Sequence, residues 1–308
     1  MKTILHLLIV VVTFALFSCQ KEIDWTLPPA SGGGNPGGGN PGGGNTGTNG
    51  DLLVKAVAIT GGTADTNVVT FTWDASKRLT QYKSTGKTNG FDVSGLYNIQ
   101  RASDGRIEKI FAEPFALFPG MPVSIDSTIY YVNYQGTTNK LKYVMATTYM
   151  SGTTFSDSIV YTYSGTGKVD KKETYRESFV SGTMELSSRE TYTYDGLGNL
   201  LTATNSTADP ITGVLAPAGT TTMTFGAGKA PAVMGEECFI ILSPENGSPN
   251  IVTKKVQSGN AGGGNVTGTI TATATVTTTN SFGRPTKGSI LVTPVPPGYT
   301  LNYTYYYQ

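Results

Sequence analysis

The sequence predicts an all-β domain, an antiparallel sheet of successive hairpins, preceded by a leader and a glycine-rich linker. Only 14% of the 308 residues are charged, against roughly a quarter in ordinary soluble proteins. Threonine is frequent, 17 tyrosines and 12 phenylalanines supply most of the aromatic content, and 39 glycines interrupt the chain. β-branched and aromatic residues favour strands, whereas glycine, asparagine and aspartate favour turns. A strand–turn–strand pattern also recurs along the chain, which indicates a meander of hairpins.

Residues 1–18 have the pattern of a cleaved signal peptide. Lys2 provides the positive start, and the apolar stretch from Ile4 to Phe17 has fourteen residues, fewer than the about 20 that a membrane-spanning helix needs. The segment ends in Leu16-Phe17-Ser18-Cys19, which resembles the lipobox of bacterial lipoproteins. The resemblance implies cleavage before Cys19 and attachment of lipid to its thiol. An ordinary secretory signal with an incidental cysteine is the alternative.

The residues after Cys19 bear on the location of the anchor. No aspartate adjoins Cys19, and the short charged stretch from Gln20 to Asp24 resembles the export signal of surface lipoproteins from the Bacteroidota. The resemblance implies lipid anchorage in the outer membrane with exposure at the cell surface; the periplasmic face is the alternative. More than one acyl chain gives durable anchoring, whereas a single chain binds a membrane only marginally.

The lipidated Cys19 begins a tether that extends to residue 50. Its glycine-rich part, residues 31–50, contains eleven glycines in twenty residues. Such a composition cannot bury enough apolar surface to offset the entropy of ordering it, so it predicts a flexible linker. The linker lacks a preceding strand, a following helix and a Lys-Ser/Thr pair, which excludes a phosphate-binding loop.

A repeat predicts the architecture of the all-β domain, residues 51–308. Strands that precede a turn end at positions 73, 101, 134, 163, 194 and 225, at intervals of 28, 33, 29, 31 and 31 residues. In the clearest copy, Tyr192 to Leu200, Tyr-x-Tyr places two rings on one face of a strand, because side chains alternate. The Asp-Gly-x-Gly-Asn that follows supplies a turn whose residues tolerate a positive φ. Each hairpin is expected to stack on its neighbours and so complete a core.

This pattern resembles the YD repeats of Rhs-type bacterial surface proteins, whose motif is Tyr-x-Tyr-Asp-x-x-Gly-Arg/Asn-Leu. Residues 192–200 match closely, and the resemblance covers about residues 68–230. Together with the lipobox, it is similar to Bacteroidota-type surface lipoproteins with degenerate YD-like hairpins. The resemblance implies an antiparallel sheet. Nothing in the chain corresponds to the toxin of full Rhs proteins, so toxin delivery is not carried over.

The rhythm changes after Lys229. The apolar run from Cys238 to Leu242 predicts a strand buried on both faces. Further strands are expected at 251–256, 267–279 and 301–307. The pattern leaves open whether residues 230–308 are a distinct C-terminal part of the same sheet.

The composition excludes several kinds of site. The one histidine, His6, lies in the leader, so the mature chain cannot contain a Ser-His or Cys-His nucleophile or a histidine-ligated metal. The mature chain has 21 basic and 21 acidic side chains and no basic run, which argues against nucleic acid. We expect no catalytic residue, cofactor, metal or disulfide. Cys238 is expected to be buried and inert, and Glu236-Glu237 to lie on opposite faces of a solvated strand edge.

The candidate binding residues are aromatic side chains of the repeat, which could stack on a glycan or simply pack the sheet. They are Trp73, Tyr163, Tyr192 and Tyr194. Ser127 and Ser158 stand in Asp-Ser-Thr and Asp-Ser-Ile, which resemble the O-glycosylation motif of exported Bacteroidota proteins.

Three functions remain open. The first is a cell-envelope lipoprotein that presents a tethered, non-enzymatic binding or structural module, with a glycan or protein at the cell surface as partner. The second is a carboxylate-dependent polysaccharide hydrolase, because glycoside cleavage needs only two carboxyl groups. A cleft with two facing carboxylates would favour it. The third is a membrane β-barrel, against which the threonine-rich faces, the lipid anchor and the final Gln308 all count.

Overall fold

The structure is a computed structural model. It describes residues 51–60, 65–88, 91–113, 125–150, 152–178, 182–209, 212–232, 234–259, 269–293 and 299–308. The expected leader, the lipid-bearing Cys19 and the tether lie outside the described residues.

Within these ranges, sixteen strands follow one another, each antiparallel to its neighbours. They are β1 (Leu53–Thr60), β2 (Thr66–Trp73), β3 (Leu79–Thr88), β4 (Phe91–Arg101), β5 (Ile107–Ala112), β6 (Ile125–Tyr134), β7 (Leu141–Met150), β8 (Thr153–Tyr163), β9 (Val169–Glu177), β10 (Met184–Tyr194), β11 (Leu200–Ala208), β12 (Leu215–Lys229), β13 (Asn250–Gly259), β14 (Thr269–Thr279), β15 (Pro285–Thr293) and β16 (Tyr299–Tyr307).

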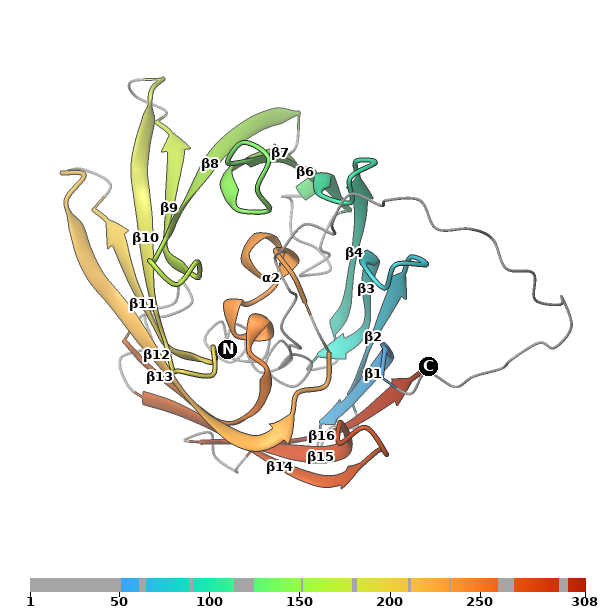
Figure 1. The fold of residues 1–308 in the computed structure, drawn as a ribbon. Helices are drawn as coiled ribbons and strands as arrows, with labels where there is room; N and C mark the ends of the chain where they lie inside the picture. The colour runs from blue at the N-terminus through green and yellow to red at the C-terminus, as the bar shows by residue number, and fades with distance from the viewer. Residues whose placement is uncertain are drawn as a thin grey trace, which may run out of the picture.

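The sheet closes into a barrel, because β1 pairs with β16 as well as with β2 (Figure 1). In the closing pair, Ala56 lies opposite Tyr305. The expected all-β meander of hairpins is confirmed. The fold prediction did not include closure, which only the third alternative, a membrane β-barrel, contained, because each repeat specifies only its own hairpin and its immediate neighbours.

The repeat corresponds to a turn that recurs in five hairpins at one end of the barrel, which we call the turn end. In each turn the first residue donates its N–H to the carbonyl of the fifth, and the fourth donates to the carbonyl of the first. The five turns are 74–78, 102–106, 164–168, 195–199 and 280–284. Aspartate or asparagine side chains accept further N–H groups in several of them, as at Asp74 and Asp195. The sequence predicted turns of this composition at this spacing.

Side chains alternate between a mainly apolar interior and a mainly polar exterior. On β2, Val69 and Phe71 are buried, whereas the intervening Thr70 and the following Thr72 are not. On β12, Met223 is buried and Thr222 is exposed. This alternation is the normal consequence of a pleated strand with one face on a core.

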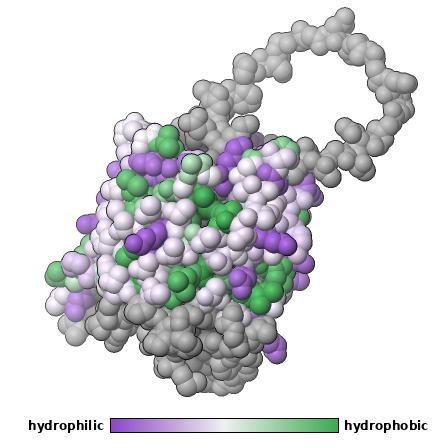
Figure 2. Space-filling view, turned by 90° about the horizontal axis from the view of Figure 1, so that it is seen from below, coloured by the Kyte–Doolittle hydropathy of each residue, from purple (hydrophilic) through white to green (hydrophobic). Residues whose placement is uncertain are grey.

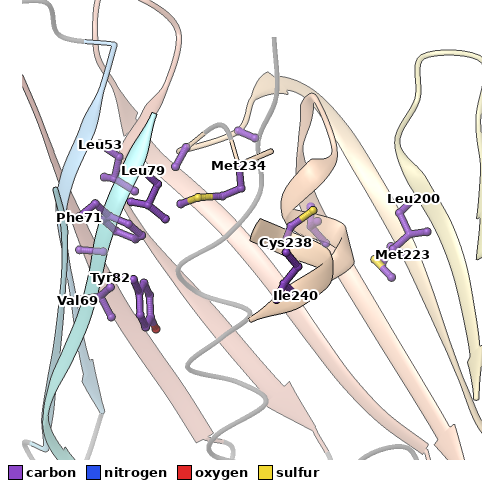
Figure 3. Packing of buried hydrophobic residues seen from close by; sticks show 14 of the residues in the cluster. Leu53, Val69, Phe71, Leu79, Tyr82, Leu200, Met223, Met234, Cys238 and Ile240 are labelled. Carbon is purple, nitrogen blue, oxygen red and sulfur yellow. The ribbon is translucent and has the colours of Figure 1, made fainter. Parts of the chain in front are cut away.

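A barrel of sixteen strands is too wide for its wall side chains to fill. The connection from β12 to β13, residues 230–249, folds into the interior at the turn end, and we call it the plug (Figure 1). It carries the helical turn α2 (Glu237–Ile240) and the 3-10 turn η1 (Pro244–Gly247). Cys238 and Ile240 lie between the side chains of β1–β3 on one side and Leu200 and Met223 on the other (Figure 3).

The predicted strand over 238–242 is therefore wrong. A strand needs a sheet edge, but every strand of the barrel is already paired on both sides. The apolar segment satisfies its backbone locally instead. The N–H groups of Ile241 and Leu242 donate to the carbonyl of Glu237 at 3.0 and 3.3 Å. The segment is buried as expected, in a helical turn. No helix of the described part of the chain is long and apolar enough to cross a membrane.

Candidate functional site at the turn end of the barrel

A cleft of about 480 Å³ opens at the turn end, between the plug and the turns of the first hairpins. Its apolar part is formed by Leu53, Leu79 and Trp73. Its polar part contains more cations than anions. The cations are Lys77, Arg78, Arg101, Arg106 and Arg284, and the anions are Asp51, Asp104, Glu236 and Glu237.

The plug is held to the wall of this cleft by a buried charged cluster. Arg101, the last residue of β4, forms an ion pair with Glu237, and these two side chains are only 9% and 4% exposed. Arg101 also donates to the carbonyl of Leu79 at 3.1 Å. The hydroxyl of Tyr134 donates to Oε1 of Glu236 at 3.1 Å. Removing one partner from such a buried pair typically costs about 3–5 kcal/mol, because it leaves a buried charge without compensation.

The two adjacent carboxyl groups differ in their surroundings. Burial raises the pKa of Glu236 to about 7, and the negative charge of Glu237 adds to the effect, while Arg101 and Tyr134 act in the opposite direction. Glu236 is therefore protonated at a higher pH than an ordinary glutamate. The expectation that Glu236 and Glu237 lie on a solvated edge is wrong, because they begin α2 inside the barrel and not a strand.

Three further arginines brace the turns around the cleft. Arg78 pairs with Asp74 at 2.7 Å and Arg106 with Asp104 at 2.6 Å. Arg284 pairs with Asp51 and donates to the carbonyl of Ala230, the first residue of the plug, at 2.7 Å. The rim is thus a set of prearranged charged groups, fixed to one another before any ligand arrives.

A second buried polar group lies elsewhere in the plug. Nζ of Lys255 contacts Oε1 of Glu245 at 2.5 Å, with both side chains under a tenth exposed. The side-chain amide of Asn246 is buried and has no hydrogen-bond partner among the described residues. Cys238 is a free, buried cysteine, as expected, and burial raises the pKa of its thiol well above the usual value. No group of three or more potential metal-ligating side chains was found among the described residues.

The candidate aromatic residues all lie on the inner face of the wall. Nε1 of Trp73 donates to the carbonyl of Leu53 at 2.7 Å, and Tyr194 to that of Val169 at 2.8 Å. Both bonds tie the last residue of one strand to the first residue of the strand before it. Trp73 lines the cleft, and the structure therefore places it next to the charged groups of the cleft.

The other three are positioned as packing residues. Tyr192 is 5% exposed and meets Phe239 of the plug edge-on, with ring centroids 5.9 Å apart. Tyr163 and Tyr194 pack against the same core. These three do not line the cleft, and a glycan-binding role for them stays a prediction.

The expected modification sites lie on the outside of the barrel. Ser127 is opposite Tyr149, and Ser158 is opposite Met145. Both serines are half-buried on outward faces of β6 and β8. Their glycosylation stays a prediction.

The sequence analysis missed Arg101 and Lys77, and it placed the two glutamates on a solvated strand edge. A signal for Arg101 was present, because it stands where the other clear repeats carry Trp73, Tyr134, Tyr163 or Tyr194. An arginine at an inward-facing, aromatic position needs a buried anion, and the adjacent Glu236-Glu237 pair was a candidate for it.

Comparison with known proteins gives a limited result. No protein-family model matches the chain, and no curated protein matches it. Among solved structures, a porin-like protein from Bacteroides uniformis has a TM-score of 0.48 and 14% identity, over 84% of this chain and 98% of its own. A porin-like protein from Bacteroides vulgatus has a TM-score of 0.49 and 11% identity, over 83% and 99%. The complex titled TcdB2-TccC3-TEV has a TM-score of 0.21 and 12% identity, over 80% of this chain and 16% of its own. At these TM-scores the likenesses carry no inference about activity or ligand.

Proposed function

We propose that the protein is a lipid-anchored binding module of the outer membrane whose barrel stands in water, outside the bilayer. Cys19 carries the anchor, the tether holds the barrel away from the lipid, and the cleft at the turn end binds a saccharide at the cell surface without cleaving it. The observation that carries the proposal is the presence of charged side chains on the outer wall, where a membrane-spanning barrel has an apolar band.

A membrane-spanning barrel has an apolar band outside and a polar lumen. Here charged groups occupy the outer wall, while the interior holds the apolar core together with several ion pairs. Tyr161 faces inward, where its hydroxyl donates to the carbonyl of Phe239 in the plug. The alternate residues of β9 therefore face outward, and Glu173 there pairs with Lys171 at 3.1 Å and Arg189 at 2.7 Å.

Other strands repeat this pattern. Lys83 and Lys254 are exposed on the outer faces of β3 and β13, and each lies opposite a threonine of the neighbouring strand. A lysine that faces lipid at the bilayer midplane costs about 2–4 kcal/mol. The outer face in Figure 2 is mostly pale, with small green and purple patches and without a continuous green band on that side. These features support a barrel in water.

The recurrence of one turn in five hairpins supports the finer resemblance to YD-repeat lipoproteins of the Bacteroidota. The neutral charge balance still disfavours nucleic acid as a partner. A saccharide fits the cleft because an aromatic side chain beside fixed charged and amide groups offers both a stacking surface and directional hydrogen bonds. Trp73 supplies the stacking surface, and the exposed Asn139 supplies an amide group for hydrogen bonds.

The test is a glycan-binding screen on the purified full chain, with release of reducing sugar measured in parallel. Trp73→Ala and Asn139→Ala alter the cleft, and Tyr306→Ala alters an aromatic residue that is 48% exposed on the outer wall. We expect binding that both cleft variants weaken and that Tyr306→Ala leaves unchanged. Binding that survives both cleft variants would place the site elsewhere and contradict the proposal.

A hydrolase is the second candidate, and Glu236 is the observation that favours it. A carboxyl group with a pKa of about 7 beside a second carboxyl group is the arrangement of a general acid and its partner. Glu237, however, is 4% exposed and already forms an ion pair with Arg101. Release of reducing sugar by the wild type, abolished in Glu236→Gln, would establish this candidate in place of the binding module.

A further inference from the structure

Lys77 has a backbone conformation that its side chain makes unfavourable. In the five identical turns, the fourth residue has a positive φ. Four of the turns place glycine there, namely Gly105, Gly167, Gly198 and Gly283, with φ between 75° and 91°. The remaining turn has Lys77 at φ 60°, and it is the one non-glycine residue with positive φ in the described part of the chain. Glycine adopts this region freely, whereas a lysine is strained there.

The strained residue lies on the cleft. Lys77 is exposed and lines the cleft, as Trp73 and Gly105 do, whereas Gly167, Gly198 and Gly283 do not line it. Backbone strain that a protein retains is concentrated where a side chain serves a function. Since the same turn is built with glycine four times in this chain, folding alone does not require a lysine at this position.

The charges of the cleft indicate what Lys77 would meet. Each of the four arginines is already paired with a carboxylate: Arg78 with Asp74, Arg101 with Glu237, Arg106 with Asp104 and Arg284 with Asp51. Lys77 has no ion-pair partner among the residues that the structure describes. The cleft therefore presents one uncommitted cation at its rim, within a surface that is otherwise electrostatically balanced.

We propose that the cleft binds an anionic saccharide and that the ammonium group of Lys77 binds its negative group, a carboxylate, sulfate or phosphate. This inference rests on the proposed function and adds the charge class of the ligand and the residue that selects it. Trp73 provides the apolar surface for the sugar ring, and the arginine–carboxylate pairs line the remainder of the cleft.

The experiment is calorimetric titration of the purified full chain with three probes: trigalacturonate, a sulfated galactotriose and neutral galactotriose. Lys77→Gly converts the strained turn into the form that the other four turns already have. We expect at least one anionic probe to bind and the neutral one to bind at least ten-fold more weakly. We expect Lys77→Gly to lose at least ten-fold in affinity for the anionic probe while its thermal unfolding temperature stays the same or rises. Lys77→Arg should retain most of the affinity.

The matched control is Lys83→Ala, which removes one exposed positive charge from the outer face of the same hairpin. It should bind like the wild type. Equal affinity for charged and neutral probes, or wild-type affinity in Lys77→Gly, would overturn the inference and leave the saccharide-binding module standing. A fall in the unfolding temperature of Lys77→Gly would overturn the argument from strain. Absence of binding to any saccharide in the wider screen would overturn the proposed function as well.

Discussion

Replacing Glu236 with glutamine is expected to remove most of the pH dependence of the barrel's stability between pH 5 and 8. The Glu236 side chain is 14% exposed at the contact between plug and wall. Its pKa is raised from 4.5 to about 7, mainly by burial and then by the charge of Glu237. Between these two pH values the folded barrel retains a proton that the unfolded chain has released, so folding and protonation are coupled.

The magnitude follows from the shift. One pKa unit corresponds to about 1.4 kcal/mol, so a shift from 4.5 to about 7 corresponds to about 3 kcal/mol. This contribution is fully present below pH 4.5 and is lost as the pH rises through 7. Glutamine remains neutral and keeps an oxygen for the hydroxyl of Tyr134. The stability of the variant relative to wild type should therefore grow with pH, from under about 1 kcal/mol near pH 5 to about 3 kcal/mol at pH 8.

The assay is urea unfolding of the full chain at pH 5, 6, 7 and 8, with the unfolding free energy obtained by linear extrapolation. Glu108→Gln is the matched control, because Glu108 is exposed on β5. The pKa values of Asp74 and Asp195 are lowered, so the contribution of these two groups to the unfolding free energy changes only below pH 5. His6 is present in the wild type and in both variants, so any contribution it makes cancels in the difference between their unfolding free energies. A constant difference between Glu236→Gln and wild type across the four pH values would refute the reasoning.

Three more predictions concern the core. Cys238 is 1% exposed, so in the lipidated chain its thiol should resist a maleimide reagent until the barrel is unfolded, as mass spectrometry would show. Lys255→Met leaves Glu245 buried without its partner and should cost about 3–5 kcal/mol in urea unfolding, whereas the Lys255→Met/Glu245→Met double variant should cost much less. Gly288→Ala places a Cβ 2.1 Å from a tyrosine hydroxyl oxygen and 2.3 Å from a backbone carbonyl oxygen, and it should lower the unfolding temperature. Gly165→Ala, with nothing within 4 Å, should not.

The local structure of the hairpins could be predicted because each one is specified within about ten residues. Strands β2, β4, β6, β8 and β10 end at the positions that the repeat spacing identified. The turn residues, such as Asp195 and Gly198, form the hydrogen bonds that their side chains and conformational freedom suggest. The last expected position, residue 225, was less accurate, because β12 continues to Lys229.

What the sequence did not reveal depends on long-range geometry. The apolar run at 238–242 predicts burial, but only the closed barrel determines that no sheet edge is available to it. The pairing of Arg101 with Glu237 joins residues 136 positions apart, and no local pattern encodes it. The functional significance of Lys77 likewise required comparison of the five turns in space, since lysine in a polar turn is unremarkable in the sequence.

The central claim is that the outer wall of the barrel faces water, and a fluorophore on that wall tests it most directly. Thr222 is exposed in the middle of β12, between Thr202 and Val256 of the neighbouring strands. A Thr222→Cys variant of the lipidated chain, labelled there and bound to vesicles, would be exposed in turn to aqueous iodide and to nitroxide-bearing lipid. Cys238 is buried and should take no label. The account predicts strong quenching by iodide and little by the lipid nitroxide. Quenching by the lipid nitroxide with protection from iodide would show that the barrel spans the membrane and would contradict the account.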